Sequence, residues 1–232
     1  MNTLKKFRPK MEILPESQRG IWPLLTPAAK MGFTLYGGTA IALQLGHRQS
    51  VDFDLFTDKV INESVILRKL PFLKQAQVVQ SSQNTLTFEY PVGNQNVKIS
   101  LFGGILFGRV GSPLLADDNG LPVASLDDLM ATKLKVILQR AEKKDYVDIV
   151  TMLRDGVSLE KGIGSACSMF GKTFPPKDCL AALTYFKDGD LETLSREDMA
   201  ALVKASSGVT DVRPQKIVSK TLGMGGWKLD KS

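Results

Sequence analysis

Two carboxylates and a pair of glycines near the start of the chain could together bind a phosphate-bearing ligand. Asp52 and Asp54 lie two apart in the segment 51–56, Val-Asp-Phe-Asp-Leu-Phe, where apolar and acidic residues alternate. Alternation is the period of a β-strand, so both carboxylates project from the same face. Paired carboxylates suit Mg²⁺, which proteins usually hold with one or two carboxylates plus substrate phosphates. The pair therefore predicts a site for Mg²⁺ or Mn²⁺.

The glycines lie at a predicted turn between a strand and a helix. Gly37 and Gly38 follow the apolar segment 33–36 and precede the uncharged segment 39–45, which we expect to be a buried helix. Glycine lets the backbone pass close to a ligand. The first N–H groups of the helix and the positive end of its dipole suit a phosphate. Thr39 could add a hydroxyl, so the turn is a candidate phosphate-binding site.

Taken singly, a Gly-Gly turn is usually only a turn, and Asp-x-Asp is usually a solvated strand end. In the order strand, Gly-Gly-Thr, helix, strand, Asp-x-Asp, they resemble the nucleotidyltransferases that share the fold of the DNA polymerase beta palm. More narrowly, the chain resembles the AbiEii/AbiGii toxin-like nucleotidyltransferases. The first motif of that family is a Gly-Gly/Ser turn followed by Arg-x-Ser-x-Asp-x-Asp. The matching residues are Gly37, Gly38, Arg48, Ser50, Asp52 and Asp54.

Three later motifs of the family also occur, in order, as far as residue 148. Lys98-Ile99 matches the second motif, a lysine before an aliphatic residue on a later strand. Lys133 and Arg140, which follow an acidic residue, match the third. The segment 144–148, Lys-Asp-Tyr-Val-Asp, matches the fourth, Lys-Asp-x-x-Asp. The resemblance implies nucleotide-binding and catalytic roles for these residues.

The roles that the resemblance implies divide the residues into three groups. The catalytic residues are Asp52, Asp54, Lys98 and Asp148, of which Asp52 and Asp54 hold the metal. The nucleotide-binding residues are Gly37, Gly38, Thr39, Arg48, Ser50, Lys133, Arg140 and Lys144. Spacing supports the pairing of Lys133 with Arg140. These residues are seven apart, close to two full turns of a helix, so their side chains share a face. The same charge pattern is also typical of a solvated helix surface.

One position departs from the superfamily pattern. A third carboxylate, serving as general base or metal ligand, usually lies on a strand after the Asp-x-Asp strand. In the predicted strand 97–102, the residue in that place is Ser100. Glu89 and Asp148 are the alternative candidates for the base. Ser100 also keeps open a second interpretation, a catalytically degenerate relative that binds a nucleotide and acts through a protein partner.

The elements that must position these residues form an α+β chain. A polymerase-beta-like mixed sheet with flanking helices is expected in a nucleotidyltransferase domain over residues 1–112, and a helical domain that completes the cleft over 113–232. The expected helices are 15–31, 39–45, 63–70, 129–139, 144–153, 158–170, 178–187 and 195–206. The expected strands are 33–36, 51–56, 75–80, 85–90 and 97–102. The Gly-rich tail 223–232 is expected to be mobile.

Composition narrows the class of protein. The chain has 232 residues, of which 43% are hydrophobic and 23% charged, so overall disorder and a fibrous repeat are excluded. Its 30 Lys and Arg residues against 24 Asp and Glu give a net charge of +6, which permits an anionic partner. One histidine excludes a His-Glu-x-x-His zinc site, and two cysteines exclude a disulfide framework. No apolar stretch suits a signal peptide or a membrane span, so we expect a cytoplasmic protein.

The functional expectation is a metal-dependent nucleotidyltransferase that moves NMP from an NTP to a hydroxyl acceptor. The resemblance implies RNA, with the 3′ end of tRNA as the leading acceptor, or a protein hydroxyl. It further implies the toxin component of a type IV-like toxin–antitoxin or abortive-infection system, with a cognate antitoxin as a partner.

Overall fold

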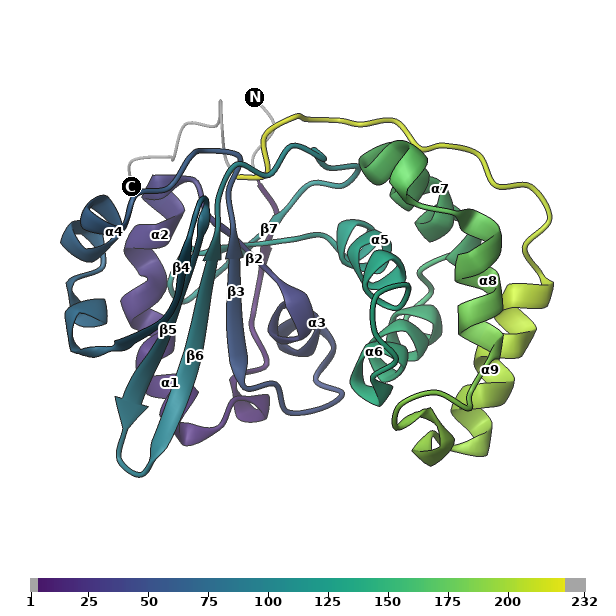
Figure 1. Cartoon of the computed structure of the whole chain (residues 1–232), viewed down its shortest axis with the longest axis horizontal. Helices are drawn as coiled ribbons and strands as arrows, with labels where there is room; N and C mark the ends of the chain where they lie inside the picture. The colour runs from purple at the N-terminus through teal and green to yellow at the C-terminus, as the bar shows by residue number, and fades with distance from the viewer. Residues whose placement is uncertain (1–3, 224–232) are drawn as a thin grey trace. The chain divides into compact units, whose positions relative to one another are not determined.

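The computed structural model describes residues 4–223, so most of the predicted mobile tail lies outside the described residues. These residues form two compact units (Figure 1). The first comprises residues 4–108, the segment Ser112–Ala124 and residues 219–223. The second comprises Arg109–Gly111 and Ser125–Val218. The segment 113–124, which we expected in the helical domain, therefore belongs to the first unit.

The first unit is built on a mixed eight-stranded sheet with the order β1-β7-β8-β2-β3-β6-β5-β4. The strands are β1 (Lys6–Phe7), β2 (Thr34–Tyr36), β3 (Asp52–Phe56), β4 (Gln77–Ser82), β5 (Thr85–Val92), β6 (Gln95–Phe102), β7 (Leu114–Ala116) and β8 (Pro122–Val123). At the centre, β3 is antiparallel to β2 and parallel to β6. All five predicted strands are present, and the predicted α+β class with a mixed sheet is confirmed.

The alternating sequence of β3 gives the sheet two chemically different faces. Phe53 and Leu55 are fully buried on one face, and the ring of Phe53 stacks on Trp22 at 6.1 Å. The helical layer that contains Trp22 therefore covers this face. Asp52 and Asp54 project from the opposite face, on which α3 (Gly37–Leu45) lies (Figure 1).

The predicted helix 15–31 is divided into α1 (Glu16–Ile21), the 3₁₀ turn Trp22–Leu25 and α2 (Thr26–Met31). Pro23 explains the division, because proline has no N–H to donate inside a helix. Gly32 ends α2 in the left-handed region, with φ of 91°. The fourth helix of the unit is α4 (Glu63–Lys69), and short 3₁₀ turns occupy Met11–Ile13 and Pro71–Gln75.

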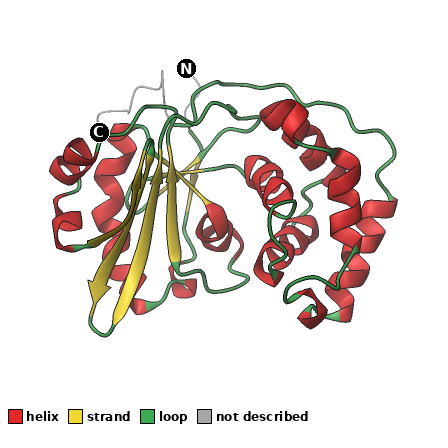
Figure 2. Cartoon of the chain, in the orientation of Figure 1, coloured by secondary structure: helices red, strands yellow, loops and turns green. Residues whose placement is uncertain are grey.

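The second unit is helical, as predicted (Figure 2). Its helices are α5 (Leu126–Val136), α6 (Lys143–Arg154), α7 (Leu159–Phe170), α8 (Pro176–Thr184) and α9 (Arg196–Ser207), with 3₁₀ turns at Gly171–Thr173 and Leu191–Thr193. Ser125, Ser158 and Ser195 cap α5, α7 and α9, each accepting a hydrogen bond from the backbone N–H three residues later. Such caps satisfy donors that the helix itself leaves unpaired. No helix within residues 4–223 has the length and apolarity to cross a bilayer.

Candidate active site

Strand register places the predicted catalytic residues of the first unit in one row on the sheet. Asp52 on β3 pairs with Lys98 on β6, and Lys98 pairs in turn with Glu89 on β5. Directly paired residues on neighbouring strands have Cβ atoms about 5 Å apart and share a face. The ammonium group of Lys98 therefore belongs to the same surface as the Asp52 carboxylate, with Glu89 one strand farther away.

The neighbouring row runs through the second carboxylate. Asp54 pairs with Tyr36 on one side and with Ser100 on the other, and Ser100 pairs with Thr87. Ser100 is only 2% exposed, and its Oγ lies 3.5 Å from Thr87 Oγ1. The position beside Asp54 is thus occupied by a buried hydroxyl. Glu89, which lies in the other row, accepts a hydrogen bond from Asn96 Nδ2 at 3.2 Å.

The Gly-Gly turn packs directly on these carboxylates. Gly37 has φ of 75°, in the left-handed region that favours glycine. A Cβ added there would lie 3.2 Å from Asp54 Cγ and would overlap Asp54 Oδ2. A Cβ on Gly38 would lie 3.2 Å from Ser50 Oγ and would overlap Arg48 Nη2. The fold therefore brings the start of α3, Asp54, Arg48 and Ser50 together at one point.

The side chain of Thr39, the third residue of this turn, is directed into the protein. It is 1% exposed, and its hydroxyl contacts Ser50 Oγ at 2.9 Å and donates to the carbonyl oxygen of Asp52. These bonds tie the first turn of α3 to the beginning of β3. Thr39 thus fixes the distance between the Gly-Gly turn and the Asp-x-Asp strand, with its hydroxyl directed into the protein.

The donor set at the turn fits a divalent cation held jointly with a nucleotide. Within residues 4–223, no three His, Cys, Asp or Glu side chains come together closely enough to hold a metal ion. Asp52 and Asp54 supply two carboxylates on one face, and the start of α3 lies against the second of them. Proteins usually bind Mg²⁺ through one or two carboxylates, and substrate phosphates complete its coordination shell.

Three of the predicted site residues of the second unit, Lys133, Arg140 and Asp148, belong to one ion network, in which Lys133 and Asp148 are buried. Lys133 Nζ lies 2.6 Å from Asp145 Oδ1 and 2.7 Å from Asp148 Oδ2. The Lys133 side chain is 8% exposed and both aspartate side chains are fully buried. Arg140 Nε donates to Asp145 Oδ2 at 2.9 Å. Burial raises the pKa of Asp145, but Lys133 and Arg140 outweigh it and hold that pKa below its usual value.

Asp145 is the residue that we did not single out from the sequence. It is the first aspartate of the Lys-Asp-x-x-Asp segment, three residues before Asp148, so both lie on one face of α6. This spacing of three residues is the sequence signal that could have identified Asp145. Lys144 points elsewhere: its side chain is 49% exposed and pairs with Glu142 Oε2 at 2.8 Å. Asp145 joins Lys133 to Arg140, Lys133 also pairs with Asp148, and Lys144 lies on the surface.

A further buried carboxylate lies at the start of α5. Asp128 accepts hydrogen bonds from Val110 N at 2.7 Å, Gly111 N at 3.3 Å and Ser125 Oγ at 2.7 Å. Burial nevertheless dominates and raises the pKa of Asp128 to about 6. This acid, which precedes Lys133 in the third motif, therefore fastens the segment Arg109–Gly111 to the helical unit.

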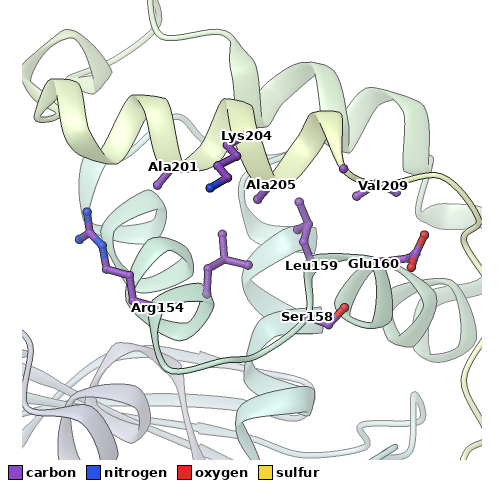
Figure 3. Close-up of a pocket in the computed structure, with 10 residues that line it drawn as sticks. Arg154, Ser158, Leu159, Glu160, Ala201, Lys204, Ala205 and Val209 are labelled. Atoms are coloured by element: carbon purple, nitrogen blue, oxygen red, sulfur yellow. The ribbon is translucent and has the colours of Figure 1, made fainter.

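A cavity of about 440 Å³ lies apart from all of these residues, within the helical unit. It is formed by the end of α6, the start of α7 and the last turns of α9, with an apolar lining that includes Leu153, Leu159 and Ala205 (Figure 3). Lys204 directs its ammonium group into it. No predicted site residue lines this cavity.

Comparison with known proteins identifies the family. The sequence model for the nucleotidyl transferase AbiEii toxin, of type IV toxin–antitoxin systems, matches residues 24–217. The chain belongs to this family. The match includes both glycines of the turn, the Asp-x-Asp strand and the buried ion network of the helical unit, and it confirms the resemblance predicted from the motifs.

Two individual proteins illustrate what this chain is similar to. An uncharacterised protein of Aquifex aeolicus is 32% identical over 124 residues, which is 53% of this chain. The match spans 58% of that relative's length. The nucleotidyltransferase toxin MenT4 from Mycobacterium tuberculosis H37Rv has a similar structure, with a TM-score of 0.54 and 15% identity over 82% of this chain and 81% of that chain.

A second solved structure shares the fold. It is an antigenic nucleotidyltransferase-like protein from Paracoccidioides brasiliensis, with a TM-score of 0.52 and 16% identity over 85% of this chain and 94% of that chain. At such low identity the likeness establishes the fold alone, which is the predicted nucleotidyltransferase fold. The role of each site residue stays a prediction.

Proposed function

We propose that this protein transfers NMP from an NTP to a hydroxyl acceptor in a reaction that depends on Mg²⁺ or Mn²⁺. The observation that carries the proposal is the packing of the Gly37 turn against Asp54. This packing brings the start of a helix, which suits phosphate, into contact with a carboxylate, which suits a metal. Membership of the AbiEii family supports the same reaction.

Each residue around the turn has a role that its surroundings support. Gly37 and Gly38 present backbone N–H groups to the NTP phosphates, and Arg48 and Ser50 lie beside them. Asp52 and Asp54 hold the metal ion. When bound, the metal neutralises charge on the phosphates and polarises the reacting phosphoryl group.

Lys98 stabilises the charge that develops on the leaving group. It is an exposed lysine in the same row as Asp52, so its ammonium can approach a bound triphosphate. In the reaction, an acceptor hydroxyl oxygen bonds to the α-phosphorus, the bond from that phosphorus to the bridging oxygen breaks, and pyrophosphate leaves. The hydroxyl proton must pass to a base. Glu89 is a carboxylate on this face of the sheet, and we propose that it takes the proton.

The proposed acceptor is RNA, with the 3′ end of tRNA as the first to test, and a protein hydroxyl is the alternative. The net charge of +6 favours RNA, because each phosphate contact uses a cation. The family further supports a toxin that is paired with a cognate antitoxin. A cytoplasmic location is part of the same proposal.

The buried hydroxyl of Ser100 favours a second candidate function. Because Ser100 takes the place of a third carboxylate beside Asp54, the chain could bind a nucleotide without transferring it and act through a protein partner. Nucleotide binding in the absence of transfer would identify this function.

The test is incubation of the purified protein with each radiolabelled NTP, Mg²⁺ and either total RNA or cell lysate. We expect label on RNA, no label after chelation of the metal, and no label with Asp52→Asn or Asp54→Asn. Asp155→Asn removes an equally negative but exposed carboxylate from the helical unit and should transfer at the wild-type rate. Wild-type transfer by either site variant at limiting metal would refute the proposed site. NTP binding with no transfer to any acceptor would favour the second function.

A further inference from the structure

A basic segment near the N-terminus, residues 4–10, carries a concentration of positive charge that the proposed site does not use. Its sequence, Leu-Lys-Lys-Phe-Arg-Pro-Lys, contains four cations and no acid. We call it the basic tract. Its cations, all exposed, are Lys5, Lys6, Arg8 and Lys10. Among residues 4–223, none of the four forms an ion pair. The tract therefore offers its full charge to an anionic partner.

The basic tract is held in place by its backbone and its apolar residues. Its strand β1 pairs with β7, where Leu115 N donates to Lys5 O and Asp117 N donates to Phe7 O, both at 3.0 Å. Within the tract, Leu4 and Pro9 are buried. A partner would meet cations whose backbone is already ordered, so less conformational entropy is lost on binding.

The last residue of the tract is fastened to the helix that begins at the Gly-Gly turn. Lys10 donates from its backbone N–H to Leu43 O and from Nζ to Leu45 O, both at 2.9 Å. These carbonyl groups belong to the C-terminal end of α3, whereas Gly37 begins it. A nine-residue helix is about 13 Å long at 1.5 Å per residue. Stacked nucleotides rise about 3.4 Å each along one strand, so about four nucleotides span the same length.

We propose that the basic tract binds the phosphate backbone of the nucleic-acid acceptor, a few nucleotides away from the reacting 3′ hydroxyl. The proposal rests on the proposed function and adds to it a surface for the acceptor. Lys6 lies on β1 and Arg8 directly follows this strand, and two residues of extended chain span about 6.6 Å. Two nucleotide steps cover a similar distance, about 6.8 Å. An ordered series of cations without exposed apolar residues among them fits a phosphate backbone better than an acidic protein surface.

The test uses a triple variant in which Lys5, Lys6 and Arg8 are each replaced by Gln. Lys10 is left intact because it fastens the tract to α3. The matched control replaces Lys172, Lys177 and Lys187 by Gln, which removes the same charge from exposed positions of the helical unit. Affinity for a short 5′-fluorescein-labelled oligouridine RNA is measured over a range of salt concentrations. Thermal unfolding confirms that both variants remain folded.

Each phosphate contact to a single strand contributes about −0.7 to the slope of log K against log salt concentration. Loss of three contacts should therefore reduce the slope by about 2, with a fall in affinity of about tenfold or more at low salt. The control should keep the wild-type slope. An equal effect of both triple variants, or no effect of the tract variant, would overturn the proposal, since only net charge or another surface would then matter.

A parallel measurement of NTP binding separates this inference from the proposed function. Both triple variants should bind labelled NTP with Mg²⁺ as the wild type does. If the wild type binds NTP but not RNA, the tract proposal fails while nucleotide transfer to a protein acceptor stands. If the tract variant loses RNA binding in a protein that binds no NTP, the tract is supported and the proposed function fails.

Discussion

Replacing Gly37 by alanine tests the closest contact in the candidate site. The change adds one methyl group at a residue with φ of 75°. An L-residue in the left-handed region costs about 1–2 kcal/mol, so the free energy of unfolding should fall by about that amount. In addition, the new Cβ would lie 3.2 Å from Asp54 Cγ and overlap Oδ2, so the carboxylate must move.

The displacement of Asp54 should affect catalysis more than stability. A shift of about 1 Å at a reacting centre can lower a rate about 100-fold. We therefore expect kcat/KM for nucleotide transfer to fall by about two orders of magnitude. Transfer of radiolabel at several NTP concentrations measures this, at a temperature well below the unfolding midpoint of the variant.

Gly93→Ala provides the matched control. Gly93 also has a positive φ, 57°, but a Cβ there meets no atom within 4 Å. Both variants should therefore lose a similar free energy of unfolding through backbone strain, and only Gly37→Ala displaces a carboxylate. A similar loss of activity in the two variants, or full activity of Gly37→Ala, would refute the assignment of this turn to the active site.

Three other changes have distinct expected results. Asp52→Asn should abolish metal-dependent transfer with little effect on thermal unfolding, because it removes a metal ligand at the half-buried start of β3; strong destabilisation would contradict this. Lys133→Met should lower the free energy of unfolding by about 3–5 kcal/mol in a denaturant titration, because buried Asp148 loses the Lys133 ammonium and Asp145 loses one of its two cations, whereas Lys144→Met should have almost no effect. The pKa of Asp128 is raised from 3.8 to about 6, so the folded state binds the proton more tightly and this group adds stability as pH falls from 6 to 4. The difference in free energy of unfolding between the wild type and Asp128→Asn should therefore shift in favour of the wild type as the pH is lowered from 6 to 4. A difference that does not change with pH would contradict the burial of this carboxyl group.

Local sequence was sufficient for most of the regular elements. The alternation in residues 51–56 predicted β3 and the shared face of its two aspartates, and Gly32 and Gly46 marked the ends of the helices before them. The predicted helix 129–139 corresponds to α5, which begins three residues earlier, directly after its Ser125 cap. These signals act within a few residues along the chain, through side-chain alternation, hydrogen bonds at helix ends and the backbone freedom of glycine.

The short strands β1, β7 and β8 escaped prediction for the opposite reason. Each has only two or three residues, too few for a periodic pattern, and each is stabilised by pairing with a distant segment. Lys6 pairs with Leu115, for example, more than a hundred residues later. As a result, residues 113–124 were expected in the helical domain, although they complete the sheet of the first unit.

The sequence by itself determined which side chains could do chemistry: the Gly-Gly turn, the paired aspartates, Lys98 and the later charged motifs. Only the tertiary structure decided their neighbours. It put Lys98 beside Asp52 and Ser100 beside Asp54, because the register between β3 and β6 depends on contacts across the whole sheet. It also buried Lys133 between two aspartates, whereas the same charges at helical spacing would suit a solvated surface. Burial and cross-strand distance depend on how remote segments pack, and the order of residues along one segment does not contain that information.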